Sequence, residues 1–294
     1  MRILFVTSNR LGDAVLATGL LDHLLHRHAT ARFTIACGPV AEGLFLRMPR
    51  RERTIVMDKR PYGRHWLPLW ASSVTTFWDL VVDVRASALS YLVPAKRRAV
   101  RRRRGGHKTA ELASLLHLSP PPLPVVWTAP QDEARAARLL PPHVPLVALG
   151  PTANWNGKIW PAERFAALFE GLRQHLPDAV PVVFAGPGAH EHSLAAPLLQ
   201  RLPGAIDLSG QLDLPTASAC LRRAALFVGN DSGLMHLAAA SGAPTLGLFG
   251  PTPWAEYGPA GRRTAVARST SARMEDLSVQ NALQAAVALL EPPG

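Results

Sequence analysis

The chain is poor in cysteine: its 294 residues include only two, Cys37 and Cys220. Two cysteines in separate halves of the chain cannot build a disulfide framework, which favours a reducing compartment. Long apolar runs are missing as well, since no stretch approaches the ~18 residues of a membrane span. The first apolar run, residues 3–6, is too short for a signal peptide. We therefore expect a soluble cytoplasmic protein.

Several chemical signatures are also absent. No cluster of Cys and His has metal-ligand spacing, no Gly-x-Ser-x-Gly elbow occurs, and there is no zinc-finger or RNA-binding motif. The segment Gly186-Pro187-Gly188 lacks the third glycine of a dinucleotide-binding fingerprint. These absences argue against a metalloenzyme, a hydrolase and an NAD-binding protein. We expect neither a metal site nor a cofactor.

Acidic residues are scarce in the first half of the chain only. Counted along the sequence, residues 1–145 hold 22 Lys and Arg against 10 Asp and Glu, whereas residues 146–294 hold 10 against 11. The densest run, residues 96–108, has eight cations and no acid. This run is either a solvated surface or a phosphate-recognition surface, and it lacks the interleaved aromatics of a nucleic-acid binder. The imbalance predicts that the first half meets an anion.

Hydrophobic residues make up 48% of the chain, enough for two ordinary cores. Short apolar runs alternate with helix-length intervals, a pattern typical of parallel sheets with crossover helices. In the first half we expect strands at residues 3–6, 33–37, 54–57 and 80–84 and a helix at 14–26. In the second half we expect strands at 146–149, 182–185, 226–228 and 245–249, helices at 161–176 and 277–290, and helices starting near 191, 214 and 233.

A proline-rich segment divides the two halves. Eight of the 27 prolines lie between Ser119 and Pro145, and proline at this density cannot supply ladder hydrogen bonds. We place the interdomain linker here, with one edge strand near residues 125–128. The prediction is an α/β protein with two Rossmann-like, doubly wound domains, residues 1–140 and 146–294. The loops that follow the strands would line a cleft between them.

Three of these loops carry candidate chemistry. Asp13 is either a general base for an acceptor hydroxyl or a simple helix cap. Residues 229–236 (GNDSGLMH) begin a small-residue helix whose N–H groups suit a pyrophosphate, with His236 one turn from Ser232; the alternative is a capped helix with a core histidine. Lys158 could neutralise charge on a leaving phosphate, although an isolated lysine is more often solvated surface.

Taken together, these motifs resemble the ADP-heptose:lipopolysaccharide heptosyltransferase family. The resemblance rests on Gly12-Asp13, residues 158–161 (KIWP), the 186–188 segment with Glu191, and residues 231–239 (DSGLMHLAA) before 249–252 (FGPT). The motifs occur in order and span roughly residues 3–255. The resemblance implies the GT-B fold, whose first domain binds mainly the acceptor and whose second domain binds the nucleotide sugar.

The resemblance also implies a role for each loop. Asp13 would be the general base in a single in-line displacement that inverts the anomeric carbon without a metal. Lys158 would stabilise the departing ADP, together with the amides around Ser232 and Gly233. The other donor-binding residues implied by the family are Thr152, Asn154, Glu191, Asp231 and His236. Asn154 departs from the family pattern, in which a hydroxyl residue is more usual.

On the acceptor side, the residues implied by the family are Arg10, Arg85, Ser87, Arg97 and Arg98. A phosphorylated, Kdo-bearing lipid A core is an anion and would account for the cations of the first half. The run Arg101–Arg104 could contact this acceptor or the inner face of the inner membrane, and both readings stay open.

The expected activity is transfer of heptose from ADP-L-glycero-D-manno-heptose to the lipopolysaccharide inner core, either Kdo-lipid A or a heptosyl acceptor. We expect no nucleic-acid partner. One alternative is a glycosyltransferase of the same fold with another nucleotide sugar or glycan acceptor. The other is a non-enzymatic polyanion-binding protein that acts through Arg101–Arg104.

Overall fold

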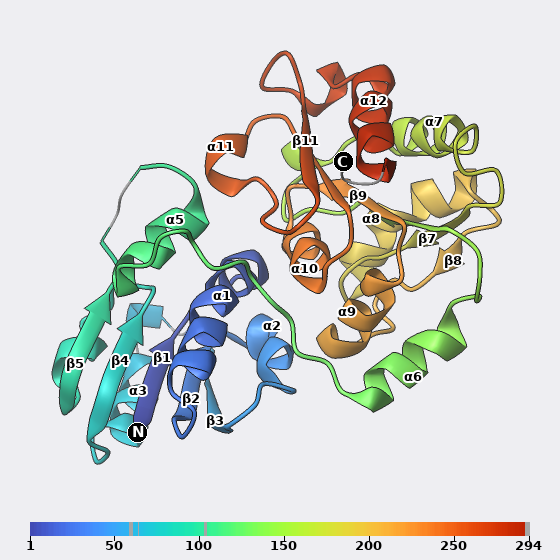
Figure 1. Ribbon diagram of the computed structural model, residues 1–294. Helices are drawn as coiled ribbons and strands as arrows, with labels where there is room; N and C mark the ends of the chain where they lie inside the picture. Colours follow the sequence, from blue (N-terminus) through green and yellow to red (C-terminus); the bar gives the residue numbers. More distant parts are fainter. Residues whose placement is uncertain (59–60, 64, 103–104, 292–294) are drawn as a thin grey trace. The chain divides into compact units, whose positions relative to one another are not determined.

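The computed structural model describes residues 1–58, 61–63, 65–102 and 105–291. The chain divides into two compact units, Met1–Trp127 and Thr128–Gly294, and each contains one sheet (Figure 1). All neighbouring strands in both sheets pair in parallel. The α/β class predicted from the alternation of apolar runs is therefore confirmed in each unit.

In the first unit strands alternate with helices, of which all but one are short. Its strands are β1 (Arg2–Val6), β2 (Arg32–Cys37), β3 (Arg51–Val56), β4 (Trp78–Asp83) and β5 (Ala95–Val100). Its helices are α1 (Leu11–Arg27), α2 (Pro39–Glu42), η1 (Gly43–Phe45), η2 (Pro61–Gly63), α3 (Trp66–Ser73), α4 (Leu89–Leu92), α5 (Lys108–Ala113) and η3 (Ser114–Leu116).

The second unit repeats this alternation of strands and helices. Its strands are β6 (Leu146–Gly150), β7 (Val180–Val183), β8 (Ile206–Asp207), β9 (Leu226–Asn230), β10 (Thr245–Phe249) and β11 (Thr264–Arg268). Its helices are α6 (Pro130–Leu139), η4 (Asn156–Lys158), α7 (Ala162–Leu172), α8 (Ala189–Arg201), α9 (Leu214–Arg222), α10 (Gly233–Ser241), α11 (Trp254–Tyr257), η5 (Met274–Asp276) and α12 (Val279–Leu290).

Both sheets are doubly wound. The strand order is β3-β2-β1-β4-β5 in the first unit and β11-β10-β9-β6-β7-β8 in the second. The direction of winding reverses between β1 and β4 in one sheet and between β6 and β9 in the other. In open α/β sheets, ligands bind outside the carboxyl ends of the strands at such a switch point. The topology therefore predicts a ligand site at one pair of loops in each unit, after β1 and β4 and after β6 and β9.

The eight strands predicted within the two halves are all present, and three further strands, β5, β8 and β11, were not predicted. The strand β5 has the sequence AKRRAV and lies at a sheet edge, where charged side chains are common because they discourage pairing with another chain. Because three of its six residues are cations of the basic run, the apolar pattern did not predict a strand there. The missed strand β8 has only two residues, and β11 is the other edge of its sheet.

The proline-rich segment differs from its prediction in two ways. Residues 121–129 form no strand, so the edge strand predicted near 125–128 is wrong. Residues 130–139 form the helix α6, which begins at a proline and belongs to the second unit (Figure 1). There Glu133 pairs with Arg222 of α9 at 2.8 Å. The division consequently falls after Trp127, earlier than the boundary predicted between 140 and 146.

Both cysteines are buried as free thiols. Burial raises the pKa of Cys37 to about 12 and that of Cys220 to about 11. We expect both thiols to react with a disulfide reagent at pH 8 at least about a hundredfold more slowly in the native protein than after unfolding, because the thiolate is the reactive form. A thiol-release assay with and without guanidinium measures this ratio. Rapid labelling of the native protein would contradict the burial of either thiol.

Candidate active site

In the first unit, Asp13 lies at the switch point beside the end of β1. It is the third residue of α1, which starts at Leu11, so this carboxylate belongs to the first helical turn. The N-cap is Arg10, and no side-chain capping bond forms there. Instead Ser8 Oγ donates to Asp13 Oδ2 at 3.3 Å and accepts from the Arg10 amide at 3.1 Å. The Asp13 carboxylate is therefore partly exposed and is not the N-cap of α1.

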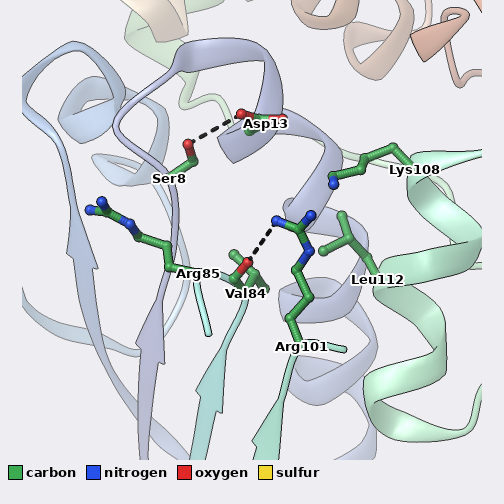
Figure 2. Close-up of a pocket in the computed structure, with 7 residues that line it drawn as sticks. All are labelled: Ser8, Asp13, Val84, Arg85, Arg101, Lys108 and Leu112. Carbon is green, nitrogen blue, oxygen red and sulfur yellow. Dashed lines mark hydrogen bonds between the residues drawn. The ribbon is translucent and has the colours of Figure 1, made fainter. Parts of the chain in front are cut away.

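A cavity of about 170 Å³ opens in front of Asp13 (Figure 2). Figure 2 shows the side chains that line it: Ser8, Asp13, Val84, Arg85, Arg101, Lys108 and Leu112. They follow β1, β4 and β5 or lie on α1 and α5, so three adjacent strand ends and two helices meet here. Three cations and one carboxylate share this space. The cavity suits an anionic molecule that brings a hydroxyl to Asp13.

A buried carboxylate fixes two of these cations. Glu111 Oε1 accepts from Arg101 Nε at 2.5 Å and from Lys108 Nζ at 2.9 Å. Lys108 and Glu111 are each only 5% exposed. A charge taken this far from water needs a partner, and Glu111 supplies it to both cations at once. Glu111 therefore determines where two positive charges of the cavity lie, a role that the sequence analysis missed.

The third cation, Arg85, was predicted as an acceptor residue and does line the cavity. Its Nη1 donates to Asn9 Oδ1 at 2.9 Å, and its guanidinium carbon lies 4.9 Å from the Trp66 ring centroid. Burial lowers the pKa of Arg85, and the charge of Asp83 opposes this shift. Asp83 also accepts hydrogen bonds from the Arg85 and Ser87 amides and from Ser87 Oγ, so Ser87 shapes the turn after β4.

Three other predicted acceptor residues lie away from the cavity lining. Arg10 is exposed in the loop before α1. Arg97 pairs with Leu80, which in turn pairs with Ile3. Because Ile3 lies three residues before the end of β1, Arg97 is roughly 10 Å from the carboxyl edge of the sheet at the usual strand rise. Arg98 donates to the carbonyls of Ser90, Ala95 and Val93 and holds α4.

The remaining cations of residues 96–108 include two that line the cavity and two that the structure does not describe. Arg101 and Lys108 reach the cavity, whereas Arg103 and Arg104 fall outside the described residues. Among the described residues of the run Arg101–Arg104, Arg101 is therefore the one that lines the cavity.

In the second unit, Lys158 and Asp231 meet at the switch point. Lys158 follows β6 in the short helix η4, and Asp231 directly follows β9. The lysine Nζ lies 2.6 Å from Asp231 Oδ2, and the two side chains are 16% and 8% exposed. The lysine is therefore not the solvated surface residue that its isolated position in the sequence would suggest. The ion pair holds one positive charge at the carboxyl edge of the sheet.

Asn230 ties the two loops together. Its Nδ2 donates to the Pro151 carbonyl at 2.8 Å, and its Oδ1 accepts from the Trp160 amide at 3.0 Å. The residue is fully buried, so both ends of the amide need these partners. In the sequence, Asn230 stands out only as one residue of the 229–236 motif. Its structural task is to hold the segment around Lys158 against the end of β9.

The start of α10 leaves donors available. Ser232 is the N-cap but makes no side-chain capping bond, and within the described residues its Oγ has no hydrogen-bond partner although that atom is buried. Gly233 opens the helix, and His236 is 5% exposed one turn later. A helix start with unused N–H groups attracts an anion. Thr152, 5% exposed, lies on the loop after the neighbouring strand β6.

Two further predicted donor residues flank this region. Glu191 lies in the first turn of α8, where its Oε2 accepts from the Gly186 amide at 3.2 Å. The preceding turn requires glycine at Gly188, because its φ is 104°. Asn154 is exposed on the loop after β6. The carboxyl ends of β9, β6 and β7 thus present the predicted donor residues side by side.

A second cavity of about 610 Å³ lies at the carboxyl ends of β10 and β11, and Phe249 and Gly250 of the 249–252 motif help to line it. Its lining includes Trp254 and Arg268, whose guanidinium carbon is 5.4 Å from the tryptophan ring centroid. Over the described ranges, no three His, Cys, Asp or Glu side chains gather as a metal ion would require. In the same part of the chain, no helix has both the length and the apolarity to cross a bilayer.

Comparison with known proteins decides the family. The family described as "Glycosyltransferase family 9 (heptosyltransferase)" matches residues 85–287. The chain belongs to glycosyltransferase family 9. The match covers the turn that carries Arg85, the cavity residues Arg101 and Lys108, and every donor loop of the second unit.

Two curated relatives of this family 9 chain are lipopolysaccharide-related heptosyltransferases. It is 31% identical over 116 residues to lipopolysaccharide heptosyltransferase 3 of Escherichia coli, a match covering 37% of this chain and 34% of that protein. This match thus spans about a third of the relative's length. It is 26% identical over 305 residues to lipooligosaccharide heptosyltransferase 2 of Haemophilus ducreyi, covering 86% of this chain and 84% of the relative.

A solved structure supports the fold of the whole family 9 chain. The structure of E. coli ADP-heptose lps heptosyltransferase II superposes with a TM-score of 0.79 at 22% identity, covering 99% of this chain and 98% of that one. The predicted GT-B class, with two Rossmann-like doubly wound domains, is thereby confirmed.

Proposed function

We propose that this family 9 chain is an inverting glycosyltransferase that moves heptose from ADP-L-glycero-D-manno-heptose to a lipopolysaccharide inner-core acceptor, either Kdo-lipid A or a heptosyl acceptor. One observation carries the proposal. Each switch point presents half of the required chemistry: a carboxylate with cations around it after β1 and β4, and a lysine with an open helix start after β6 and β9. The names of the relatives support the choice of sugar.

The reaction needs a base and a stabilised leaving group. Asp13 takes the proton of the acceptor hydroxyl while that oxygen attacks the anomeric carbon. The bond to the ADP oxygen breaks on the opposite face, so the configuration inverts and ADP leaves with the bonding electrons. Lys158 and the N–H groups at the start of α10 stabilise the charge that develops on the diphosphate. These groups supply positive charge from the chain itself, and we propose that transfer needs no metal.

The remaining donor residues orient the nucleotide. Asp231 holds Lys158 in place at 2.6 Å. The buried, unpartnered Oγ of Ser232 supports a ligand group at the helix start. We propose that Thr152 and Asn154 contact the phosphates, that Glu191 contacts the ribose, and that His236 completes the donor pocket.

On the acceptor side, the structure supports a changed set of residues. Arg85 keeps its proposed role, and Arg101 and Lys108 join it because both line the cavity with Asp13. Ser87 acts through the turn after β4. We propose that the chain works in the cytoplasm at the inner face of the inner membrane, where an anionic, lipid-anchored acceptor would be presented to these cations.

The proposed function is tested with purified chain, ADP-heptose and Kdo-lipid A. We expect release of ADP that depends on both substrates and persists in excess EDTA. Calorimetry should show ADP binding at least about tenfold tighter than UDP, a difference of ~1.4 kcal/mol. Tighter binding of UDP would point to another nucleotide sugar. Turnover that requires an added divalent ion would contradict the metal-free mechanism.

The acceptor cavity gives a separate prediction. Arg101→Gln and Lys108→Gln should each raise the KM for the acceptor by about tenfold and leave the KM for ADP-heptose unchanged, because each removes one charge-assisted contact from the acceptor cavity. Arg27→Gln is the matched control, since Arg27 is an exposed cation at the far end of α1 in the same unit. Steady-state kinetics measures the split. A loss of donor binding in either variant would contradict the division of labour.

A further inference from the structure

The helices α3 and α4 of the first unit turn apolar side chains outward. Leu67 and Trp70 on α3 are 64% and 41% exposed, and Tyr91 and Leu92 on α4 are 67% and 62% exposed. We call these four residues the α3–α4 face. The inward side chains Leu69 and Leu89 pack with Leu4, Val6 and Val81 in the core below. Both helices are therefore apolar on the buried side and on the outer side.

Charged residues are absent from both segments. Residues 66–78 (WLPLWASSVTTFW) and 86–95 (ASALSYLVPA) contain no Asp, Glu, Lys or Arg. The exposed positions of α3 are Leu67, Pro68, Trp70 and Ala71, all apolar. A surface helix ordinarily carries polar or charged residues on its outer side. Exposed apolar side chains that gather on one surface mark a contact with a partner or a membrane.

Hydrogen bonds join the two helices of the face and place an arginine beside each of them. Trp70 Nε1 donates to the Leu92 carbonyl at 3.1 Å and joins the two helices. Arg53 Nη2 donates to the Ser72 carbonyl at 2.5 Å beside α3. Arg98 Nε donates to the Ser90 carbonyl at 2.7 Å beside α4. Both arginines are exposed, so each end of the face carries positive charge at its edge.

The α3–α4 face starts beside a tryptophan that contacts an arginine of the acceptor cavity. Trp66, the first residue of α3, lies under the Arg85 guanidinium, whose carbon is 4.9 Å from the ring centroid. Arg85 also lines the cavity that contains Asp13. Trp66 directly precedes Leu67 in the chain, so one residue connects the contact with Arg85 to the first residue of the face. A molecule lying on the face could therefore extend a polar group into the cavity.

We propose that the α3–α4 face docks on an anionic lipid bilayer. Tryptophan and tyrosine favour the boundary between headgroups and acyl chains, and leucine favours the chains below it. Arginines at the border are attracted to anionic headgroups. Docking on a bilayer adds a membrane contact to the proposed transferase function. It rests on that function for one point, that the acceptor is lipid-anchored and enters the cavity from this surface.

The test uses sedimentation of the full chain with vesicles of phosphatidylcholine alone or with 30% phosphatidylglycerol. We expect the wild type to bind the anionic vesicles and Leu67→Ser/Leu92→Ser to bind them at least about tenfold more weakly, because two exposed leucines no longer enter the lipid. Val40→Ser/Leu46→Ser is the matched control: these residues are 64% and 45% exposed but lie at α2 and after η1. The control should bind like the wild type.

Kinetics separates this proposal from the proposed function. The Leu67/Leu92 variant should match the wild type on a de-acylated, water-soluble acceptor and lose about tenfold in kcat/KM on acceptor embedded in anionic vesicles. Equal vesicle binding by variant and wild type would overturn the docking face. The docking face would also be overturned if the variant lost self-association in light scattering and kept its vesicle binding. That result would show that the face contacts a second copy of the chain. Absence of transfer to the soluble acceptor would overturn the proposed function while leaving the sedimentation result intact.

Discussion

Asp13→Ala is expected to lower kcat by about a thousandfold, within the range that a positioned general base contributes. The carboxylate lies in the first turn of α1 and lines the acceptor cavity, and Ser8 Oγ donates to it. Without it, the acceptor hydroxyl keeps its proton as it approaches the anomeric carbon. The KM for ADP-heptose should stay unchanged, since the donor residues belong to the other unit. Steady-state kinetics at saturating donor and acceptor measures both constants.

The control for this experiment is Asp22→Ala. Asp22 is a partly exposed carboxylate on the same helix, where it pairs with His26 at 3.4 Å. Its removal deletes an equal charge from α1 without touching the cavity, so activity should stay close to wild type. Turnover by Asp13→Ala within a few-fold of wild type would exclude Asp13 as the base. Asp13→Asn should be as inactive as the alanine variant, because the amide keeps the shape and cannot take the proton.

Lys158→Ala should lower kcat by about a hundredfold and weaken ADP binding, because it removes the cation that we propose stabilises the departing diphosphate. The ion pair complicates this substitution. Asp231 is 8% exposed at its side chain, so the single variant leaves a buried carboxylate without its partner. Thermal unfolding should show that loss as reduced stability. The double variant Lys158→Ala/Asp231→Asn removes the unpaired charge and should recover stability but not activity.

Arg173→Ala supplies the matched control for Lys158. Arg173 is a cation of the same unit whose side chain is 53% exposed, and its pair with Glu170 at 3.6 Å is solvated. Its loss should leave kcat and ADP affinity unchanged. The outcome that contradicts the leaving-group role is a double variant that regains both stability and turnover. In that case Lys158 would hold Asp231 in place without acting on the diphosphate.

Much of this site could be predicted because strand-loop-helix chemistry is local. Asp13 follows β1, and Asp231 and Ser232 follow β9, so an apolar run and the first residues of a helix mark each position in the sequence. The parallel alternation then places all such loops at the carboxyl ends of the strands. The predicted positions of Lys158 and Asp231 proved to be neighbours because β6 and β9 pair directly.

What could not be predicted depends on contacts between distant residues. The sequence shows six arginines and two lysines in residues 96–108 but not that Arg97 and Arg98 lie on an edge strand. Only the fold shows that Arg101 and Lys108 converge on Glu111. A buried carboxylate shared by two cations leaves no periodic signal. The same holds for Asn230, whose partners lie 79 and 70 residues away in the chain.

The connection between the two units is short. The proline-rich stretch suggests a long tether, yet Val125 is bound to α1 through Thr18 Oγ1 at 2.9 Å. Thr128 is bound to Glu133 and Arg222 of the second unit at 2.8 and 3.2 Å. Between these two anchored residues the chain has only Val126 and Trp127. The covalent connection between the two anchored residues is therefore only two residues long, and it starts from a residue bonded to α1, the helix that carries Asp13.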